Sequence, residues 1–230
     1  MNSINYQLPI TNYQLGLIGY PLGHSLSPKI HAAALSACGL QGTYSLFPIP
    51  PENKQALHDL LIRVRSDEIT GLNVTIPHKQ NVIELMDELT PTAKAIGAVN
   101  TIYLREGKLI GDNTDAPGFL ADLKQFIGSR ELGIGNRKSA AVLGAGGSAR
   151  AVVYALLNDG WKVTLAARRF EQAEQLAKSF TDYQLQVADF SSFIIPHSAL
   201  IVNTTPLGMT PNIDSSPLPE NIKLSPNTII

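Results

Sequence analysis

The hydrophobic pattern along the chain alternates between short apolar runs, which are typical of strands, and segments with helical spacing. In the first half, strands are predicted at residues 13–20, 43–49 and 69–76, and helices at residues 27–38 and 53–65. For the first helix we expect Ser27 at the N-cap, Pro28 at the first helical position and Gly39 just past the end. Strand and helix therefore alternate from the start of the chain.

The second half continues the alternation. Residues 95–104 and 108–112 predict a strand pair that turns on Glu106 and Gly107, and a helix is predicted at residues 116–126. Residues 128–138, "GSRELGIGNRK", are the most linker-like in the chain. Residues 139–169 then contain a strand, a glycine turn, a helix stopped by Gly160 and a second strand. This order predicts an α/β protein with largely parallel sheets.

Composition narrows the classes of partner. The chain has 230 residues, long enough for one large domain or two modest ones. It is 44% hydrophobic and 16% charged with a formal net charge of -1, so there is no electrostatic reason to expect a nucleic acid or an acidic membrane as partner. We expect a small-molecule ligand instead.

Metal and export signals are weak in this sequence. Cys38 is the only cysteine, which excludes a disulfide framework and a thiolate metal cluster, and the five histidines contain no HxxxH pair. The N-terminus lacks a basic segment followed by an apolar core, and no run reaches the roughly 18 apolar residues of a membrane span. The sequence predicts no metal site and a cytoplasmic protein.

The glycine turn has the flanks of a dinucleotide-binding site. Gly144, Gly146 and Ala149 form G-x-G-x-x-A between a strand and a helix. The first glycine would make the tight turn, the second would let the backbone approach a pyrophosphate at the helix N-terminus, and the small third residue would permit close packing. The alternative is a tight turn that binds nothing.

The end of the second strand indicates which dinucleotide is bound. An NAD site would place an acid there for the ribose hydroxyls, but this chain has Ala167, Arg168 and Arg169. Two guanidinium groups suit the 2′-phosphate of NADP. The alternative is that both arginines simply face water at the start of a helix.

Several polar residues elsewhere have both a functional and a structural interpretation. Ser25 and Ser27 could offer hydroxyls to a ligand carboxylate, although Ser27 before a proline also looks like an N-cap. Asp115 has a similar alternative as the cap of the following helix, and Asn100 could be a turn residue. Lys79 in "NVTIPHK", taken alone, is more simply a surface charge.

Taken together, these stretches closely resemble the shikimate dehydrogenase family. Six motifs occur in the family's order: "GYPLGHSLSPKIHAAAL", "GLNVTIPHK", "IGAVNTI", "GDNTDAPGF", "GAGGSARA" and "NTTPLGM". The resemblance implies an N-terminal substrate domain, expected at residues 1–114, and a Rossmann NADP domain with a parallel sheet, expected at residues 115–230. It also implies the NADPH-dependent reduction of 3-dehydroshikimate to shikimate on the route to chorismate and the aromatic amino acids.

Residue roles follow from the matching motifs. The resemblance implies that Ser25 and Ser27 hold the substrate carboxylate, and that Lys79 and Asp115 are the catalytic pair. Further residues would surround the substrate hydroxyls or contact the cofactor. The former are Asn73, Thr75, Asn100 and Asp115; the latter are Gly144, Ala145, Gly146, Gly147, Ser148, Ala149, Arg168, Arg169, Thr204 and Met209.

Two departures from the family pattern bear on these expectations. The family usually has Asn-Arg-Thr where this chain has Ala167, Arg168 and Arg169, so the key arginine is kept and the adenine pocket is altered. Family members also continue past the position of Ile230, so we expect this chain to lack their C-terminal helices. Two alternative functions are an NAD-preferring quinate/shikimate dehydrogenase and a sensor that binds a shikimate-like ligand without turnover; a homodimer is possible.

Overall fold

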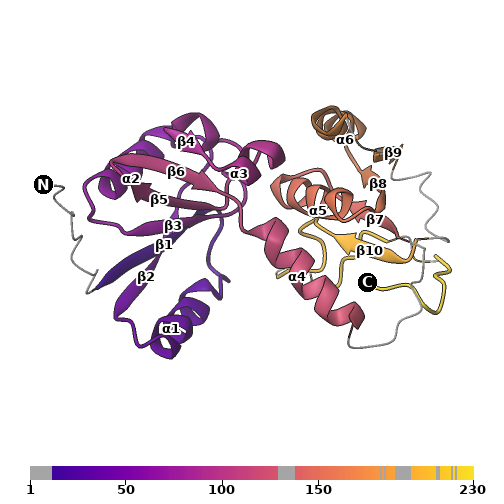
Figure 1. Cartoon of the computed structure of the whole chain (residues 1–230), viewed down its shortest axis with the longest axis horizontal. Helices are drawn as coiled ribbons and strands as arrows, with labels where there is room; N and C mark the ends of the chain where they lie inside the picture. Colours follow the sequence, from indigo (N-terminus) through magenta and orange to yellow (C-terminus); the bar gives the residue numbers. More distant parts are fainter. Residues whose placement is uncertain are drawn as a thin grey trace, which may run out of the picture. The chain divides into compact units, whose positions relative to one another are not determined.

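The computed structural model describes residues 12–128, 138–181, 183, 185–189, 198–210, 213–218, 220 and 222–230 (Figure 1). The chain forms two compact units. Unit 1 comprises Met1–Glu88 and Asn100–Gly111, and unit 2 comprises Leu89–Val99 and Asp112–Ile230. An eleven-residue segment of unit 2, Leu89–Val99, is therefore inserted in the sequence between two segments of unit 1. The division predicted after residue 114 stays a prediction.

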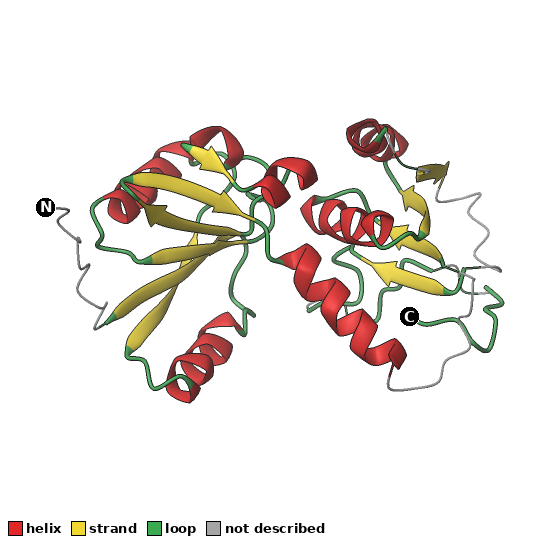
Figure 2. Cartoon of the chain, in the orientation of Figure 1, coloured by secondary structure: helices red, strands yellow, loops and turns green. Residues whose placement is uncertain are grey.

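Unit 1 is built on a six-stranded sheet of order β2-β1-β3-β5-β6-β4 (Figure 2). Its strands are β1 (Tyr13–Gly19), β2 (Gly42–Pro48), β3 (Gly71–Val74), β4 (Glu88–Leu89), β5 (Thr101–Arg105) and β6 (Lys108–Asp112). β1 runs parallel to β2 and to β3, whereas β3 and β5 are antiparallel. The α/β class is confirmed, but this sheet is mixed rather than parallel throughout.

Two helices cover the parallel part of this sheet. α1 (Ser27–Ala37) connects β1 to β2, and α2 (Lys54–Arg65) connects β2 to β3. Because these two crossovers run in opposite directions across the sheet, right-handed connections place the helices on opposite faces, as Figure 1 shows. α2 buries a full stripe of Leu57, Leu60, Leu61 and Val64, while α1 has no buried residue.

The start of α1 differs from the sequence-based expectation. The N-cap is Leu26, with no side-chain capping hydrogen bond, and Ser27 is the first helical residue. The N-cap role expected for Ser27 is therefore wrong. Ser25 supplies the missing acceptor, because its Oγ accepts the Ser27 N–H at 3.3 Å. Ser27 keeps its hydroxyl available for other partners.

The predicted strand pair at residues 95–112 is present in a shorter form. β5 and β6 are neighbours, and they turn on Glu106 and Gly107, whose φ angles of 53° and 74° are both positive. Two positive φ values are what a tight hairpin turn requires. Residues ahead of β5 instead form α3 (Pro91–Ile96), which ends at Gly97 in the left-handed conformation.

Unit 2 contains a four-stranded, fully parallel sheet of order β10-β7-β8-β9. The strands are β7 (Ser139–Leu143), β8 (Lys162–Ala167), β9 (Leu185–Asp189) and β10 (Leu200–Asn203). α5 (Gly147–Asn158) and α6 (Phe170–Ala177) connect successive strands, and α4 (Asp115–Gly128) packs against α5. The predicted βαβ unit and its parallel sheet are confirmed.

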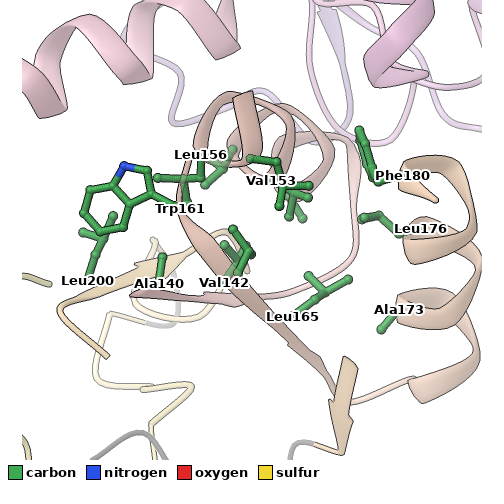
Figure 3. Close-up of a cluster of buried hydrophobic side chains, with 14 of the residues drawn as sticks. Ala140, Val142, Val153, Leu156, Trp161, Leu165, Ala173, Leu176, Phe180 and Leu200 are labelled. Atoms are coloured by element: carbon green, nitrogen blue, oxygen red, sulfur yellow. The ribbon is translucent and has the colours of Figure 1, made fainter. Parts of the chain in front are cut away.

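The main core of unit 2 lies between the sheet and these crossover helices. Figure 3 shows Val153 and Leu156 of α5 and Leu176 of α6 directed toward Val142 and Leu165 of the sheet. All five side chains are fully buried. The opposite face of the sheet carries a smaller buried cluster of Ala141, Leu143, Ala166 and Ile201. A sheet buried on both faces is the reason why its strands read as nearly continuous apolar runs.

The apolar run at the end of the sequence lies beside the edge strand β10. Ile229 forms a parallel bridge with Leu200, and the Ile201 N–H donates to the Ile229 carbonyl at 2.8 Å. Within the described residues, no helix combines the length and the apolar character needed to cross a membrane.

Candidate active site

Several predicted substrate residues of unit 1 lie at one end of its strands, where β1 and β3 finish and β5 begins. The Thr75 N–H donates to the Ile18 carbonyl at 2.8 Å, so the end of β3 is tied to the end of β1. The Val74 N–H donates to the Asn100 carbonyl, also at 2.8 Å, because antiparallel β5 begins where β3 ends. Thr75 and Asn100 therefore lie at the same end of the strands. The loop that carries Ser25 follows β1 from this end.

A chain of side-chain hydrogen bonds joins three of the predicted substrate residues in unit 1. Ser27 forms a side-chain hydrogen bond with Tyr44, and the Tyr44 hydroxyl donates to Asn73 Oδ1 at 2.8 Å. Asn73 Nδ2 then donates to Thr101 Oγ1 at 3.5 Å, and Thr101 Oγ1 donates to Asn100 Oδ1 at 2.9 Å. We call these five residues, Ser27, Tyr44, Asn73, Thr101 and Asn100, the polar chain.

The ring of Tyr44 is partly buried. It stacks on His31 of α1, with ring centroids 4.1 Å apart and an interplanar angle of 16°. Burial raises the pKa of Tyr44 to about 12, and the hydrogen bond from Ser27 only partly opposes this shift. Burial also lowers the pKa of His31. Tyr44 is therefore a neutral hydroxyl donor at physiological pH.

Lys79 follows a tightly fixed turn. The preceding residue, His78, is 2% exposed, and its Nε2 lies 2.7 Å from the Ile49 carbonyl oxygen. Since a carbonyl can only accept, His78 carries a hydrogen on Nε2 and donates it to Ile49. Its backbone N–H donates to Thr75 O at 2.9 Å, and its carbonyl accepts from the Val82 N–H at 3.1 Å. The backbone that leads into Lys79 is held on both sides.

Asp115 belongs to unit 2 and is the first residue of α4, one residue earlier than the helix predicted from sequence. Its N–H donates to Asn113 Oδ1 at 3.1 Å, so Asn113 supplies the acceptor for the first N–H of α4. Asn113 is 1% exposed, and its Nδ2 donates to the Ala98 carbonyl at 2.9 Å. Asn113 therefore links the start of α4 to Ala98, in the segment before β5.

The glycine turn of unit 2 lies where the sheet reverses its strand order. β8 and β9 extend from one side of β7, and β10 lies on the other side. Gly144 follows β7 with a φ of +113°, and a Cβ built there would lie 2.6 Å from Thr204 Oγ1. Thr204 follows β10, and its N–H and Oγ1 both donate to the Leu143 carbonyl, at 2.9 and 2.6 Å. The carboxyl ends of the strands at such a reversal are where ligands bind in open α/β sheets.

The second glycine of the fingerprint faces open space. Gly146 is the N-cap of α5, without a side-chain capping hydrogen bond, and a Cβ built there meets nothing within 4 Å. The first turn of α5, with Gly147 and Ser148, follows Ala145 and Gly146 directly. Ala149 is fully buried in the core under the helix. The loop thus has an open side for a ligand and a packed side against the sheet.

Arg168 and Arg169 follow β8 and are both exposed, next to the strand that carries the glycine turn. Their exposure fits a contact with a phosphate, and it also fits arginines that simply face water.

Asn203 organises the loop after β10: its Oδ1 accepts from the Thr205 N–H at 2.9 Å, and its Nδ2 donates to Leu207 O at 2.9 Å. Met209 in the same loop is 63% exposed. Asn203 therefore holds the shape of the loop that carries Thr204 and Met209.

Sequence reasoning missed the residues that hold these groups in place. Tyr44, Thr101 and Asn113 each bond to a predicted site residue, and Asn203 shapes the loop that carries Thr204 and Met209. Asn113 and Asn203 do lie inside recognisable motifs, whereas Tyr44 lies in none. Within the described part of the chain, no group of three or more metal-ligating side chains is present.

Two family models match the sequence. The one described as "Shikimate dehydrogenase substrate binding domain" matches residues 17–102, and "Shikimate / quinate 5-dehydrogenase" matches residues 127–206. A shikimate dehydrogenase (NADP(+)) from Nostoc sp. is 40% identical over 215 residues, which cover 90% of this chain and 72% of that protein. The chain belongs to the shikimate dehydrogenase family.

Solved structures agree with this membership. Shikimate 5-dehydrogenase from Thermus thermophilus, in complex with NADP(H) and shikimate, has a TM-score of 0.76 and 39% identity over 90% of this chain and 73% of that chain. Quinate dehydrogenase from Corynebacterium glutamicum, in complex with NAD, has a TM-score of 0.77 and 30% identity over 90% of this chain and 75% of that chain. The predicted fold and family resemblance are confirmed.

Proposed function

We propose that the chain is an NADP-dependent shikimate dehydrogenase that reversibly reduces 3-dehydroshikimate to shikimate. The observation that carries the proposal is that Thr75 and Asn100 lie at the same end of the unit 1 strands, with Ser27, Asn73 and Asn100 joined in the polar chain. Hydroxyl and amide groups of this kind suit a small, polyhydroxylated carboxylic acid. The similarity to shikimate dehydrogenases, at about 40% identity, supports the same substrate.

The residues of unit 2 fit a dinucleotide. Gly146 leaves open space in front of α5, and the turn at Gly144 lies against Thr204 at the reversal of strand order. Backbone N–H groups at a helix start suit a pyrophosphate, and the exposed Arg168 and Arg169 suit a 2′-phosphate. Ala145, Gly147, Ser148, Ala149, Thr204 and Met209 complete the proposed cofactor site. When bound, NADPH supplies the hydride that reduces the ketone.

We assign the substrate contacts to unit 1. The hydroxyls of Ser25 and Ser27, at the start of α1, would hold the substrate carboxylate, which a helix N-terminus also favours. Asn73, Thr75 and Asn100 would bind the ring hydroxyls. Asn73 and Asn100 are well suited to this task because their side chains are already oriented by hydrogen bonds.

Lys79 and Asp115 form the proposed catalytic pair. As the ketone carbon gains a hydride, its oxygen gains negative charge, so the Lys79 ammonium stabilises that oxygen and then transfers a proton to it. The product is a secondary alcohol, and in the reverse direction the neutral amine of Lys79 removes the hydroxyl proton. Asp115 would accept a hydrogen bond from a neighbouring hydroxyl of the substrate.

The test is a matrix of two substrates and two cofactors. Shikimate or quinate is offered with NADP⁺ or NAD⁺, and reduction of the cofactor is followed at the absorbance maximum of its reduced form. We expect the highest kcat/KM for shikimate with NADP⁺. A preference for quinate with NAD⁺ would favour the quinate dehydrogenase, and tight shikimate binding without turnover would favour a sensor.

We further propose that the protein works in the cytoplasm, as expected for a single exposed thiol and no disulfide framework, and that it can act as a homodimer. Light scattering of the purified protein at micromolar concentration gives the assembly mass directly. A mass of 24.8 kDa would show a monomer and reject the dimer.

A further inference from the structure

Tyr44 has no role in the function described so far, yet it lies at the centre of the polar chain. Resting on the proposed function, we propose that Tyr44 is a substrate-positioning residue: its hydroxyl joins Ser27, on the carboxylate side of the site, to Asn73, on the hydroxyl side. It acts through these two residues rather than on the reacting atoms.

The register of the sheet explains how Tyr44 reaches both partners. Tyr44 on β2 pairs with Leu15 on β1, and Asn73 on β3 pairs with Leu17 on β1. Leu15 and Leu17 are two residues apart, so Tyr44 and Asn73 lie on the same face of the sheet, on the strands that flank β1. A tyrosine is long enough to cross the intervening strand, and its hydroxyl arrives at Asn73 Oδ1 at 2.8 Å.

The same face receives the first turns of α1. Ser27 and His31 are four residues apart on this helix and therefore share one side of it. Ser27 bonds to the Tyr44 hydroxyl and His31 stacks on the Tyr44 ring. Tyr44 consequently ties α1, which has no buried residue of its own, to the strand that carries Asn73.

The direction of the hydrogen bonds defines what Tyr44 does to Asn73. A phenol hydroxyl has one hydrogen, and Tyr44 gives it to Asn73 Oδ1. The Asn73 amide is thereby oriented with Nδ2 as the donating end, toward the Asn100 carbonyl at 3.4 Å and Thr101 Oγ1 at 3.5 Å. These two contacts are long, so Tyr44 provides the shortest bond that fixes this amide.

Because the single hydrogen of the Tyr44 hydroxyl is given to Asn73, Ser27 gives its hydrogen to the Tyr44 oxygen. A substrate carboxylate is a charged acceptor and competes successfully for that hydrogen. The Tyr44 oxygen thus holds the Ser27 side chain in one rotamer until the carboxylate binds. Removing it leaves both Ser27 and Asn73 to be ordered by the substrate, at the expense of affinity.

The test variant is Tyr44→Phe, which keeps the ring stacked on His31 and removes only the hydroxyl. The matched control is Tyr183→Phe in unit 2, which removes a tyrosine hydroxyl that donates to Asn158 Oδ1 at 2.9 Å. Shikimate affinity is measured by calorimetry without cofactor, and KM and kcat are measured for both substrates. All assays are made at a temperature at which circular dichroism shows each variant folded.

For Tyr44→Phe we expect the shikimate Kd and KM to rise about 3- to 10-fold, from the loss of a neutral hydrogen bond. The KM for NADP⁺ should not change, kcat should fall less than about 3-fold, and Tyr183→Phe should match the wild type.

An unchanged shikimate Kd would overturn the inference, and so would a loss shared equally by kcat and both KM values, which would indicate a general structural role. A wild-type chain that neither binds nor oxidises shikimate would instead reject the proposed function, and this inference with it.

Discussion

The two candidate binding regions are built in different ways. In unit 1 the site consists of side chains oriented by other side chains, with Tyr44 donating to Asn73 at 2.8 Å and Thr101 donating to Asn100 at 2.9 Å. In unit 2 the site is defined by backbone, with a positive-φ turn at Gly144 packed against Thr204 and open space at Gly146. The two constructions suit their proposed ligands, since backbone N–H groups can bind any phosphate whereas a particular pattern of ring hydroxyls needs particular side chains.

This difference predicts how each region responds to substitution. In unit 1, removal of one functional group should change substrate affinity or rate while the fold is kept. In unit 2, adding a single carbon at Gly144 should disturb the packing itself, because a Cβ there would overlap Thr204. The following substitutions test that contrast, beginning with the largest expected effect.

Lys79→Ala should lower kcat by about 10²- to 10⁴-fold and change the shikimate Kd by only a few fold, because the loss falls on a group that acts mainly on the reacting oxygen. Stopped-flow and steady-state kinetics measure both quantities. The control is Lys108→Ala, which removes a surface lysine 3.6 Å from Glu88. Retention of more than about half of the wild-type kcat by Lys79→Ala would reject the catalytic assignment.

Gly144→Ala should destabilise the protein by about 2 to 5 kcal/mol, because it combines an unfavourable φ with a steric overlap at Thr204. Gly107→Ala is the matched control: its φ of +74° is also positive, but a Cβ there meets nothing within 4 Å, so only about 1 to 2 kcal/mol is expected. Urea denaturation of both variants gives the comparison. Equal losses would show that the packing against Thr204 is unimportant.

Arg168→Ala should weaken NADPH by about 10- to 150-fold and leave NADH unchanged, since only NADPH carries the 2′-phosphate, and the loss of a charge-assisted hydrogen bond costs about 1.5 to 3 kcal/mol. Fluorescence titration with both cofactors measures this, and Arg169→Ala determines how the two arginines share the phosphate. If Arg168→Ala affected the two cofactors equally, the arginine would not read the phosphate.

The smallest effect concerns acid stability. The hydrogen bonds from Arg65, at 2.7 and 2.9 Å, and from the Leu109 N–H lower the pKa of Asp87 to about 2. A lowered folded-state pKa means that the stabilisation is present above about pH 4 and is lost as the pH falls toward 2. Asp87→Asn should therefore lower the urea midpoint at pH 7, and the difference from the wild type should shrink between pH 4 and pH 2.

Because Asp87 lies outside both binding regions, the Asp87→Asn variant should keep the wild-type KM values at neutral pH. Glu68→Gln, which removes an exposed partner of Arg63, is the control and should have little effect at either pH. A difference in midpoint that stays constant down to pH 2 would contradict the role assigned to the Asp87 carboxylate.

The parts of the structure that could be predicted from sequence depend on local signals. Two features have a short, characteristic sequence pattern. They are the glycine turn between its flanking strands and the hairpin that turns on Glu106 and Gly107. The N-cap prediction at Ser27 failed because the helix already begins at Ser27, whose own N–H donates to the hydroxyl of Ser25, two residues earlier. Local patterns identify a helix start well but place it only within one or two residues.

The parts that could not be predicted depend on contacts between distant residues. Tyr44 lies 29 residues before Asn73, and only the strand order β2-β1-β3 brings the two side chains to one face. The assignment of Leu89–Val99 to unit 2 likewise depends on packing, with Ile96 and Ala98 buried against Ala151 and Ala155 of α5. Neither feature has a sequence pattern of its own.

The central claim is that this chain carries out hydride transfer to a ketone, and an isotope experiment tests it most directly. The purified protein is incubated with 3-dehydroshikimate and NADPH deuterated at both C4 positions, and the product is analysed by mass spectrometry. We predict shikimate that carries a single deuterium on the new carbinol carbon, with Lys79→Ala forming it about 10²- to 10⁴-fold more slowly. Unlabelled shikimate, or no product from a protein shown to be folded, would contradict the account.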